Sequence, residues 1–121
     1  MIQVVSKVKG IDNSGAKLSM VIRILGGNKR KPANLGSNLI VTVKKATTQS
    51  KIKKGQVCKF KLLRTNSTIN RKDGTQLTFD KNGGIFLDNE FSPIGSRILG
   101  PLAREIETIN TKISSMSKKI L

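Results

Sequence analysis

Residues 17–25 read KLSMVIRIL, and this stretch decides the fold class of the chain. Its apolar residues recur at every second position, as in a β-strand that buries one face and exposes the other. The residues of the expected buried face are Leu18, Met20, Ile22 and Ile24, which alternate with Lys17, Ser19, Val21 and Arg23. This pattern predicts a fold built mainly from β-strands.

The same alternation occurs in two further stretches. In residues 38–45 the expected inward face carries Leu39, Val41 and Val43. In residues 57–64 the side chains of Cys58, Phe60 and Leu62 share one face, and those of Lys59 and Lys61 are expected to point outward.

Glycine-containing turns separate these strands and leave room for shorter ones. The shorter strands fit residues 2–8, 75–79 and 84–88. Five or six short antiparallel strands joined in this way form a sandwich or a closed barrel. We expect a small closed β-barrel, because closure removes exposed strand edges in so short a chain.

The pattern changes after residue 92. Pro101 suits the first turn of a helix, and Leu102, Ile106 and Ile109 follow at helical spacing. A second short helix would carry the apolar residues Ile113, Met116 and Ile120. We therefore expect a single domain over residues 1–121, with a barrel in 1–91 and one or two helices in 92–121 that cap one end of it.

Positive charge is concentrated in the first two thirds of the chain. The net charge is +16, and 17 of the 23 Lys and Arg residues lie before residue 80, where the only acids are Asp12 and Asp73. Each cation that neutralises a phosphate releases condensed counterions, so segregated charge of this size favours a nucleic-acid partner.

Three basic connections are the candidate contacts. The loop at residues 25–36 and the hairpin arm at residues 64–75 lie between strands, and a third basic stretch runs from residue 44 to 54. The residues expected to face RNA in them are Lys29, Arg30 and Lys31 in the loop, Arg71 and Lys72 in the arm, and Lys44, Lys53 and Lys54 in the third stretch.

Several other classes of function are excluded or disfavoured. With no His and one cysteine, Cys58, the chain cannot build its own zinc cluster or use histidine acid–base chemistry. Residues 10–17 only approximate a phosphate-binding loop and precede a strand, where that loop needs a helix. No apolar run approaches the roughly 20 residues that cross a bilayer. We expect no catalytic residue, metal, cofactor or membrane partner.

Two alternatives remain open at this point. A free single-stranded RNA chaperone would share the barrel and the charge, but such proteins offer exposed aromatic rings, and this chain has four Phe and no Tyr or Trp. An RNA-processing enzyme would need a carboxylate cluster, whereas Asp12 and Asp73 both lie in turns. Recognition through phosphate, sugar and shape is the expected mode.

The order of the motifs resembles that of a known family. Asp12-Asn13-Ser14-Gly15-Ala16 is followed by Ile24-Leu25-Gly26-Gly27, and Pro93-Ile94-Gly95-Ser96-Arg97-Ile98-Leu99-Gly100-Pro101 stands near the end. From Met1 to about Ile113 the chain resembles the universal large-subunit ribosomal protein fourteen family, of bacterial or organellar type.

The resemblance implies a five-stranded barrel with C-terminal helices, bound to large-subunit ribosomal RNA. It also implies contact with small-subunit RNA through intersubunit bridges, and with neighbouring large-subunit proteins of the three and nineteen types. By its position in the family pattern, Arg64 is also expected to face RNA. The family's surface for a ribosome-silencing factor maps to Ser96, Arg97 and Lys112.

Some segments depart from the family pattern. Residues 60–63 and 83–86 differ from the usual small and branched residues, and residues 114–121 become basic. The altered ending implies different neighbours there. Lysine also outnumbers arginine, and the N-terminus has no transit-peptide pattern. We expect an organelle-encoded protein of the mitochondrial ribosome, with a plastid or the cytoplasm of an AT-rich bacterium as the alternative.

Overall fold

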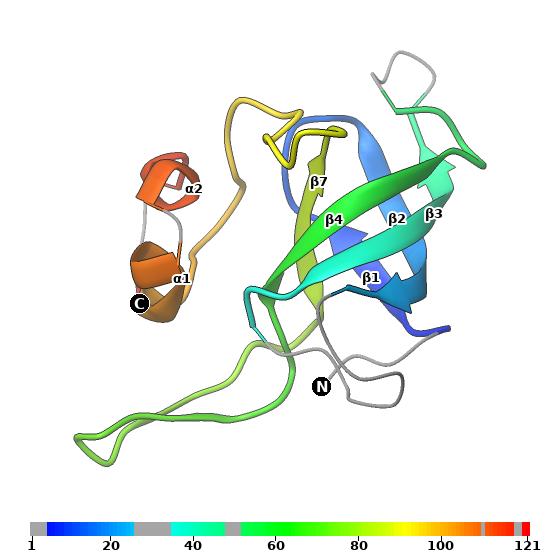
Figure 1. Ribbon diagram of the computed structural model, residues 1–121. Helices are drawn as coiled ribbons and strands as arrows, with labels where there is room; N and C mark the ends of the chain where they lie inside the picture. The colour runs from blue at the N-terminus through cyan, green and yellow to red at the C-terminus, as the bar shows by residue number, and fades with distance from the viewer. Residues whose placement is uncertain (1–4, 26–34, 48–51, 110, 118–119) are drawn as a thin grey trace.

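The computed structural model describes residues 5–25, 35–47, 52–109, 111–117 and 120–121 (Figure 1). Five strands close into a barrel in the order β1-β2-β3-β4-β7. They are β1 Lys7–Gly10, β2 Ala16–Ile24, β3 Asn38–Ala46, β4 Val57–Arg64 and β7 Gly83–Leu87. The small closed barrel in a mainly β chain is confirmed.

Two details of the barrel differ from expectation. The sequence predicted antiparallel strands throughout, but β1 and β7 pair in parallel and thereby close the barrel. The first strand was expected at residues 2–8, whereas β1 begins at Lys7; residues 1–4 lie outside the described part of the chain.

The inside of the barrel is packed with apolar side chains. Leu39 and Val41 are fully buried and Val43 nearly so, which confirms the inward face expected for β3. In the same core the rings of Phe60 and Phe86 meet edge to face, with centroids 5.0 Å apart. This geometry is favourable for aromatic pairs.

The inward face expected for β2 is wrong except at Ile24, which packs against the core. Val21 is fully buried and Ile22 is 43% exposed, the reverse of the predicted alternation. The pairing of β2 with β3 shifts register near Lys17 and again at Ile22. Each such bulge places two successive residues on the same face. As a result the core side of β2 carries Ala16, Ser19, Val21 and Ile24.

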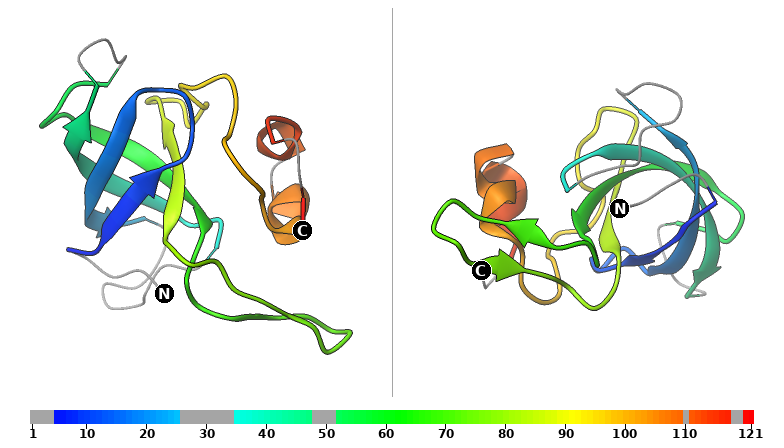
Figure 2. Two further views of the ribbon diagram at one scale, coloured as in Figure 1. Left: turned by 180° about the vertical axis from the view of Figure 1, so that it is seen from behind. Right: turned by 90° about the horizontal axis from the view of Figure 1, so that it is seen from below.

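Strand β7 and the second half of β4 are buried on both faces. Their outer side chains, Leu63, Ile85 and Leu87, form a second apolar cluster with Leu102, Ile106 and other residues of the C-terminal segment. Helices α1 Arg104–Ile109 and α2 Thr111–Ser115 belong to this segment. They lie beside the barrel wall in both views of Figure 2, rather than over the open end where the sequence analysis placed them.

Two residues of this region were assigned wrongly from the sequence. Ile120 was expected in the second helix but forms a parallel bridge with Leu102. Lys61 was expected to point into solvent but is only 9% exposed, and its Nζ donates to Asn38 Oδ1 at 3.1 Å. Burial lowers the pKa of this lysine.

The expected hairpin arm projects from the barrel (Figure 1). It contains the short ribbon of β5 Ile69–Asn70 and β6 Gln76–Leu77. A turn at Asp73 joins the two strands, because its Oδ1 accepts from the Thr75 hydroxyl at 2.6 Å and from the Thr75 amide at 3.1 Å. The return leg continues beyond Thr75, since the Phe79 amide donates to the Thr65 carbonyl.

Candidate nucleic-acid interface

The turn between β3 and β4 presents two of the expected RNA-facing residues. Lys53 and Lys54 are exposed, while Ile52 beside them is buried in the barrel core. The turn is fixed by the Lys53 amide donating to Gln56 Oε1 at 3.1 Å. The buried Ile52 and this hydrogen bond anchor the backbone that carries both lysines. Lys44, on β3, is exposed as well.

Arg64 is occupied by main-chain partners. Its Nε donates to the Pro101 carbonyl at 3.0 Å, and its Nη2 donates to the Leu99 carbonyl. Burial lowers the pKa of this guanidinium, and the charge of Asp80 acts in the opposite direction. Arg64 therefore links the end of β4 to the segment that leads into α1.

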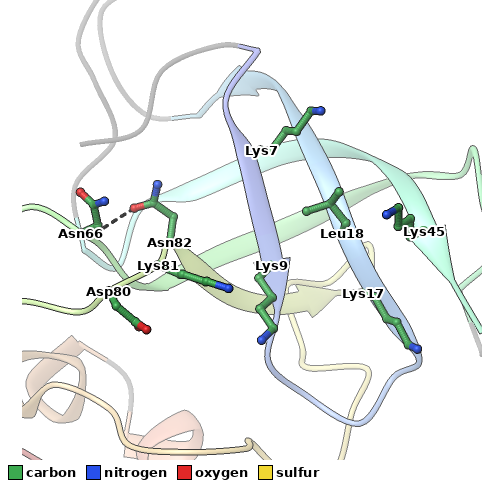
Figure 3. Close-up of a pocket in the computed structure, with 9 residues that line it drawn as sticks. All are labelled: Lys7, Lys9, Lys17, Leu18, Lys45, Asn66, Asp80, Lys81 and Asn82. Atoms are coloured by element: carbon green, nitrogen blue, oxygen red, sulfur yellow. Dashed lines mark hydrogen bonds between the residues drawn. The ribbon is translucent and has the colours of Figure 1, made fainter.

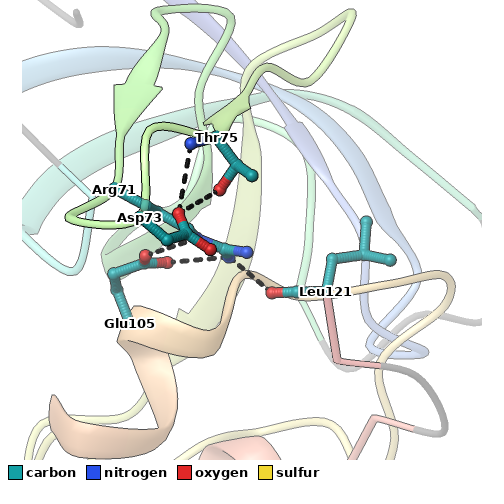
Figure 4. A network of polar contacts seen from close by, with 5 residues as sticks. All are labelled: Arg71, Asp73, Thr75, Glu105 and Leu121. Carbon is teal, nitrogen blue, oxygen red and sulfur yellow. Dashed lines mark hydrogen bonds and ion pairs between the residues drawn. The ribbon is translucent and has the colours of Figure 1, made fainter.

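Arg71 is also engaged, at the base of the turn in the arm (Figure 4). It forms an ion pair with Glu105 of α1 and donates to the Leu121 carbonyl at 2.5 Å. The ion pair raises the pKa of Arg71 and lowers that of Glu105. Lys72, the next residue, is exposed. Of the two bases expected in the arm, Lys72 is thus the one that faces solvent.

The structure describes some of the remaining residues expected to form binding surfaces and leaves others outside its described part. Lys29, Arg30 and Lys31 fall outside the described residues. Ser96 and Arg97 are exposed, in a loop that Asn13 holds. Lys112 lies in α2, with its side chain outside the described part.

The Asn13 contacts explain what the Asp-Asn-Ser-Gly motif does in the fold. Asn13 Oδ1 accepts from the Ser96 amide at 2.8 Å, and its Nδ2 donates to the Ser96 hydroxyl at 2.8 Å. Asp12 is buried and accepts from the Ser14 hydroxyl at 2.7 Å and the Phe86 amide at 3.3 Å. Burial raises the pKa of Asp12 although these hydrogen bonds lower it. The motif therefore joins the β1–β2 turn to the loop around residue 96.

A groove on the outer surface of the barrel was missed by the sequence analysis. It has a volume of about 470 Å³ and lies over β1 and β2 (Figure 3). Five lysines line this lysine groove: Lys7, Lys9, Lys17, Lys45 and Lys81. Lys7 and Lys9 stand two positions apart in β1 and so share a face, a pattern that is visible in the sequence. The sequence analysis expected this strand to end at residue 8 and therefore left Lys9 outside it.

The bulges in β2 and β3 build one side of the groove. The register with β3 changes on both sides of Leu18, so Lys17 and Leu18 both face outward, as do Lys44 and Lys45 opposite them. A regular alternation would have turned one residue of each pair into the core. The same bulges therefore explain both the error in the inward face predicted for β2 and one side of the lysine groove.

The rest of the groove lining is polar. The Asn66 amide donates to Asn82 Oδ1 at 3.0 Å, which orients the Asn82 side chain (Figure 3). Asp80 contributes the one carboxylate among the residues that line the groove. The electrostatic character of the groove is therefore strongly positive.

Other kinds of site find little support in the described residues. Within them no group of three or more His, Cys, Asp or Glu side chains is arranged to hold a metal ion. No helix in those segments is long and apolar enough to span a bilayer. Cys58 is half-buried, and burial raises the pKa of its thiol to about 11, with the charge of Asp12 adding to the effect.

A comparison with protein families adds a sequence-wide finding to this geometry. The model of the family described as ribosomal protein L14p/L23e matches residues 1–121, the full length of the chain.

Proposed function

The chain belongs to the ribosomal protein L14p/L23e family and is thus a protein of the large ribosomal subunit; we propose that it binds large-subunit ribosomal RNA there through its basic loops. The observation that carries this proposal is the family match over the whole chain. The net charge of +16, concentrated before residue 80, supports it.

The mechanism we propose is neutralisation of RNA phosphates by cations on a rigid frame. The barrel fixes the turn that carries Lys53 and Lys54, and Lys44 projects from its β3 strand. Lys72 projects from the arm, and Arg64 and Arg71 hold the arm and barrel to the C-terminal segment. The loop residues Lys29, Arg30 and Lys31 complete the proposed RNA-facing set on the basis of sequence.

Further contacts are proposed from family membership. They are small-subunit RNA at an intersubunit bridge and large-subunit proteins of the three and nineteen types. A ribosome-silencing factor would contact the surface of Ser96, Arg97 and Lys112. The composition, with lysine far above arginine, supports a mitochondrial ribosome.

The alternative of a free RNA chaperone has one observation in its favour. Phe91 is 43% exposed, and Lys59 Nζ lies 4.1 Å from its ring centroid. A stacking platform normally offers several open aromatic faces, and the described residues offer this one, already partly covered. The alternative is therefore the weaker proposal.

Sedimentation of a lysate tests the function directly. The protein should migrate stoichiometrically with large subunits and monosomes at moderate salt, and the organelle fraction containing it identifies the compartment. A variant with Lys29, Arg30 and Lys31 replaced by Ala should show reduced incorporation into large subunits. Unchanged occupancy would remove that loop from the proposal, and a slowly sedimenting pool released by nuclease would favour the chaperone.

A further inference from the structure

We propose that the lysine groove binds the sugar–phosphate backbone of RNA, as a contact separate from the basic loops; this inference rests on the proposed RNA-binding function. The groove is made by β1, β2, β3 and the segment before β7. Lys45 belongs to the basic stretch 44–54, whereas the other four lysines lie outside the three basic connections that the sequence predicted as contacts.

The charges of the groove are unpaired within the described part of the chain. The ion pair found there joins Arg71 and Glu105, and no groove lysine lies within 4.0 Å of a described carboxylate. Five ammonium groups against one carboxylate repel one another in the free protein. A bound polyanion neutralises the charges that repel one another, and its binding also releases condensed counterions. Both effects favour binding.

The arrangement of the lysines fits a chain of phosphates better than a single small anion. Lys7 and Lys9 project from the same face of β1 about 7 Å apart. Lys17 and Lys45 continue the row on β2 and β3, which are spaced about 5 Å from their neighbours. Four of the five cations are therefore spread over three adjacent strands, and the fifth, Lys81, lies before β7, so they do not converge on one point.

The uncharged residues add contacts that a sugar and base can use. Leu18 is half-buried between the lysines and offers an apolar surface. Asn82 Oδ1 is occupied by the Asn66 amide, and no described residue accepts from its Nδ2, which remains able to donate. An amide donor next to cations suits a ribose hydroxyl or a phosphate oxygen.

An acidic protein segment is the competing occupant. Protein–protein interfaces are depleted in lysine, which is strongly hydrated, whereas lysine serves as a point charge at phosphates. The groove contains five lysines and one fully apolar side chain among its lining residues. This composition favours RNA.

The test compares two variants of equal charge. Lys9→Gln with Lys17→Gln alters the groove, and Arg23→Gln with Arg104→Gln removes two exposed cations elsewhere. Binding to deproteinised large-subunit ribosomal RNA is measured over a range of salt concentrations. The groove variant should bind more weakly, and its slope of log K against log salt should fall by about 1.4, or about 0.7 per phosphate contact. The control should keep the slope of the wild type.

The outcomes separate this inference from the proposed function. If wild type binds RNA and the two variants share its slope, the groove is no RNA site although the function stands. If wild type fails to bind RNA or to enter large subunits, the proposed function itself fails. Acetylation of lysines in intact large subunits supplies a second readout: Lys9, Lys17 and Lys45 should be protected, and nuclease should expose them. Protection that survives nuclease would assign the groove to a protein and overturn the inference.

Discussion

The guanidinium group of Arg71 donates to both carboxylate oxygens of Glu105, at 3.0 Å and 3.4 Å (Figure 4). These residues lie 34 positions apart, one in the projecting arm and the other in α1. The contact with the Leu121 carbonyl adds a third point of attachment. The orientation of the arm is therefore set by the body of the protein before any RNA is bound.

Replacing Arg71 by Gln should raise the pKa of Glu105 toward its ordinary value of 4.5, because the hydrogen bond from Arg71 is the largest cause of its depression. A depressed carboxyl pKa contributes stability that is present above pH 4.5 and is lost as the pH falls through the lower folded value. Wild type and variant should thus differ in stability at neutral pH and converge in acid. A carbon-detected NMR titration of the Glu105 carboxyl measures the shift.

Lys72→Gln is the matched control, since it removes an adjacent exposed cation that does not contact Glu105. Its Glu105 titration should overlay that of the wild type. An unchanged midpoint in the Arg71 variant would mean that the ion pair does not form in solution.

Asp12→Asn should destabilise the fold by about 1–3 kcal/mol, the cost of leaving a buried hydrogen-bond donor without an acceptor. The two carboxylate oxygens serve different donors: Oδ1 accepts from Ser14 and Oδ2 from the Phe86 amide. An amide has one oxygen, so one of these donors must lose its partner. Urea unfolding at neutral pH measures the loss.

Asp73→Asn provides the comparison for this effect. Asp73 is exposed, and its Oδ1 alone accepts from Thr75. Asparagine can keep both of those bonds, so this variant should lose less stability than Asp12→Asn. Equal losses would show that the buried position of Asp12 is unimportant.

The sequence predicted the inward residues of β3 and not those of β2, and the reason is local. The pairs Leu39–Phe60, Ile40–Lys59 and Val41–Cys58 follow an unbroken register, so alternation in the sequence equals alternation in space. Strand β2 contains bulges, which depend on its pairing with β3 and leave no mark in residue composition.

The lysine groove could not be predicted for a related reason. Its cations come from segments up to 74 positions apart, between Lys7 and Lys81, and only barrel closure through the parallel β1–β7 pair brings them together. Exposed turns such as Lys53-Lys54 were predictable because a local glycine marks them. Arg64 and Arg71 were assigned by charge or position, and their partners emerge only in the folded chain.

Gly84→Ala should destabilise the barrel by about 3 kcal/mol, at the upper end of the usual cost of overpacking. A Cβ at this position would overlap the Lys61 carbonyl and lie 2.6 Å from Phe60 Cε1. The carbonyl belongs to the adjacent strand β4 and cannot swing away as a flexible side chain would. Thermal unfolding measures the change.

Gly55→Ala separates crowding from backbone strain. Gly55 has a φ of +86° with nothing within 4 Å of an added Cβ, so its variant should lose only about 1 kcal/mol from the left-handed conformation. If Gly84→Ala is no worse than Gly55→Ala, strands β4 and β7 do not approach as closely as the structure places them.

Two adjacent substitutions test which side chains of β2 point into the barrel. Val21→Lys places an ammonium group inside the barrel, where Val21 is fully buried, and should cost about 3–5 kcal/mol as an uncompensated buried charge. Ile22→Lys adds the same charge at a position 43% exposed and should change stability by no more than about 0.5 kcal/mol. Urea unfolding of both variants at one pH gives the comparison. A simple alternation from Leu18 to Ile24 requires the opposite ranking, because it turns Ile22 inward and Val21 outward. That ranking would also return Lys17 and Leu18 to opposite faces and remove one side of the lysine groove.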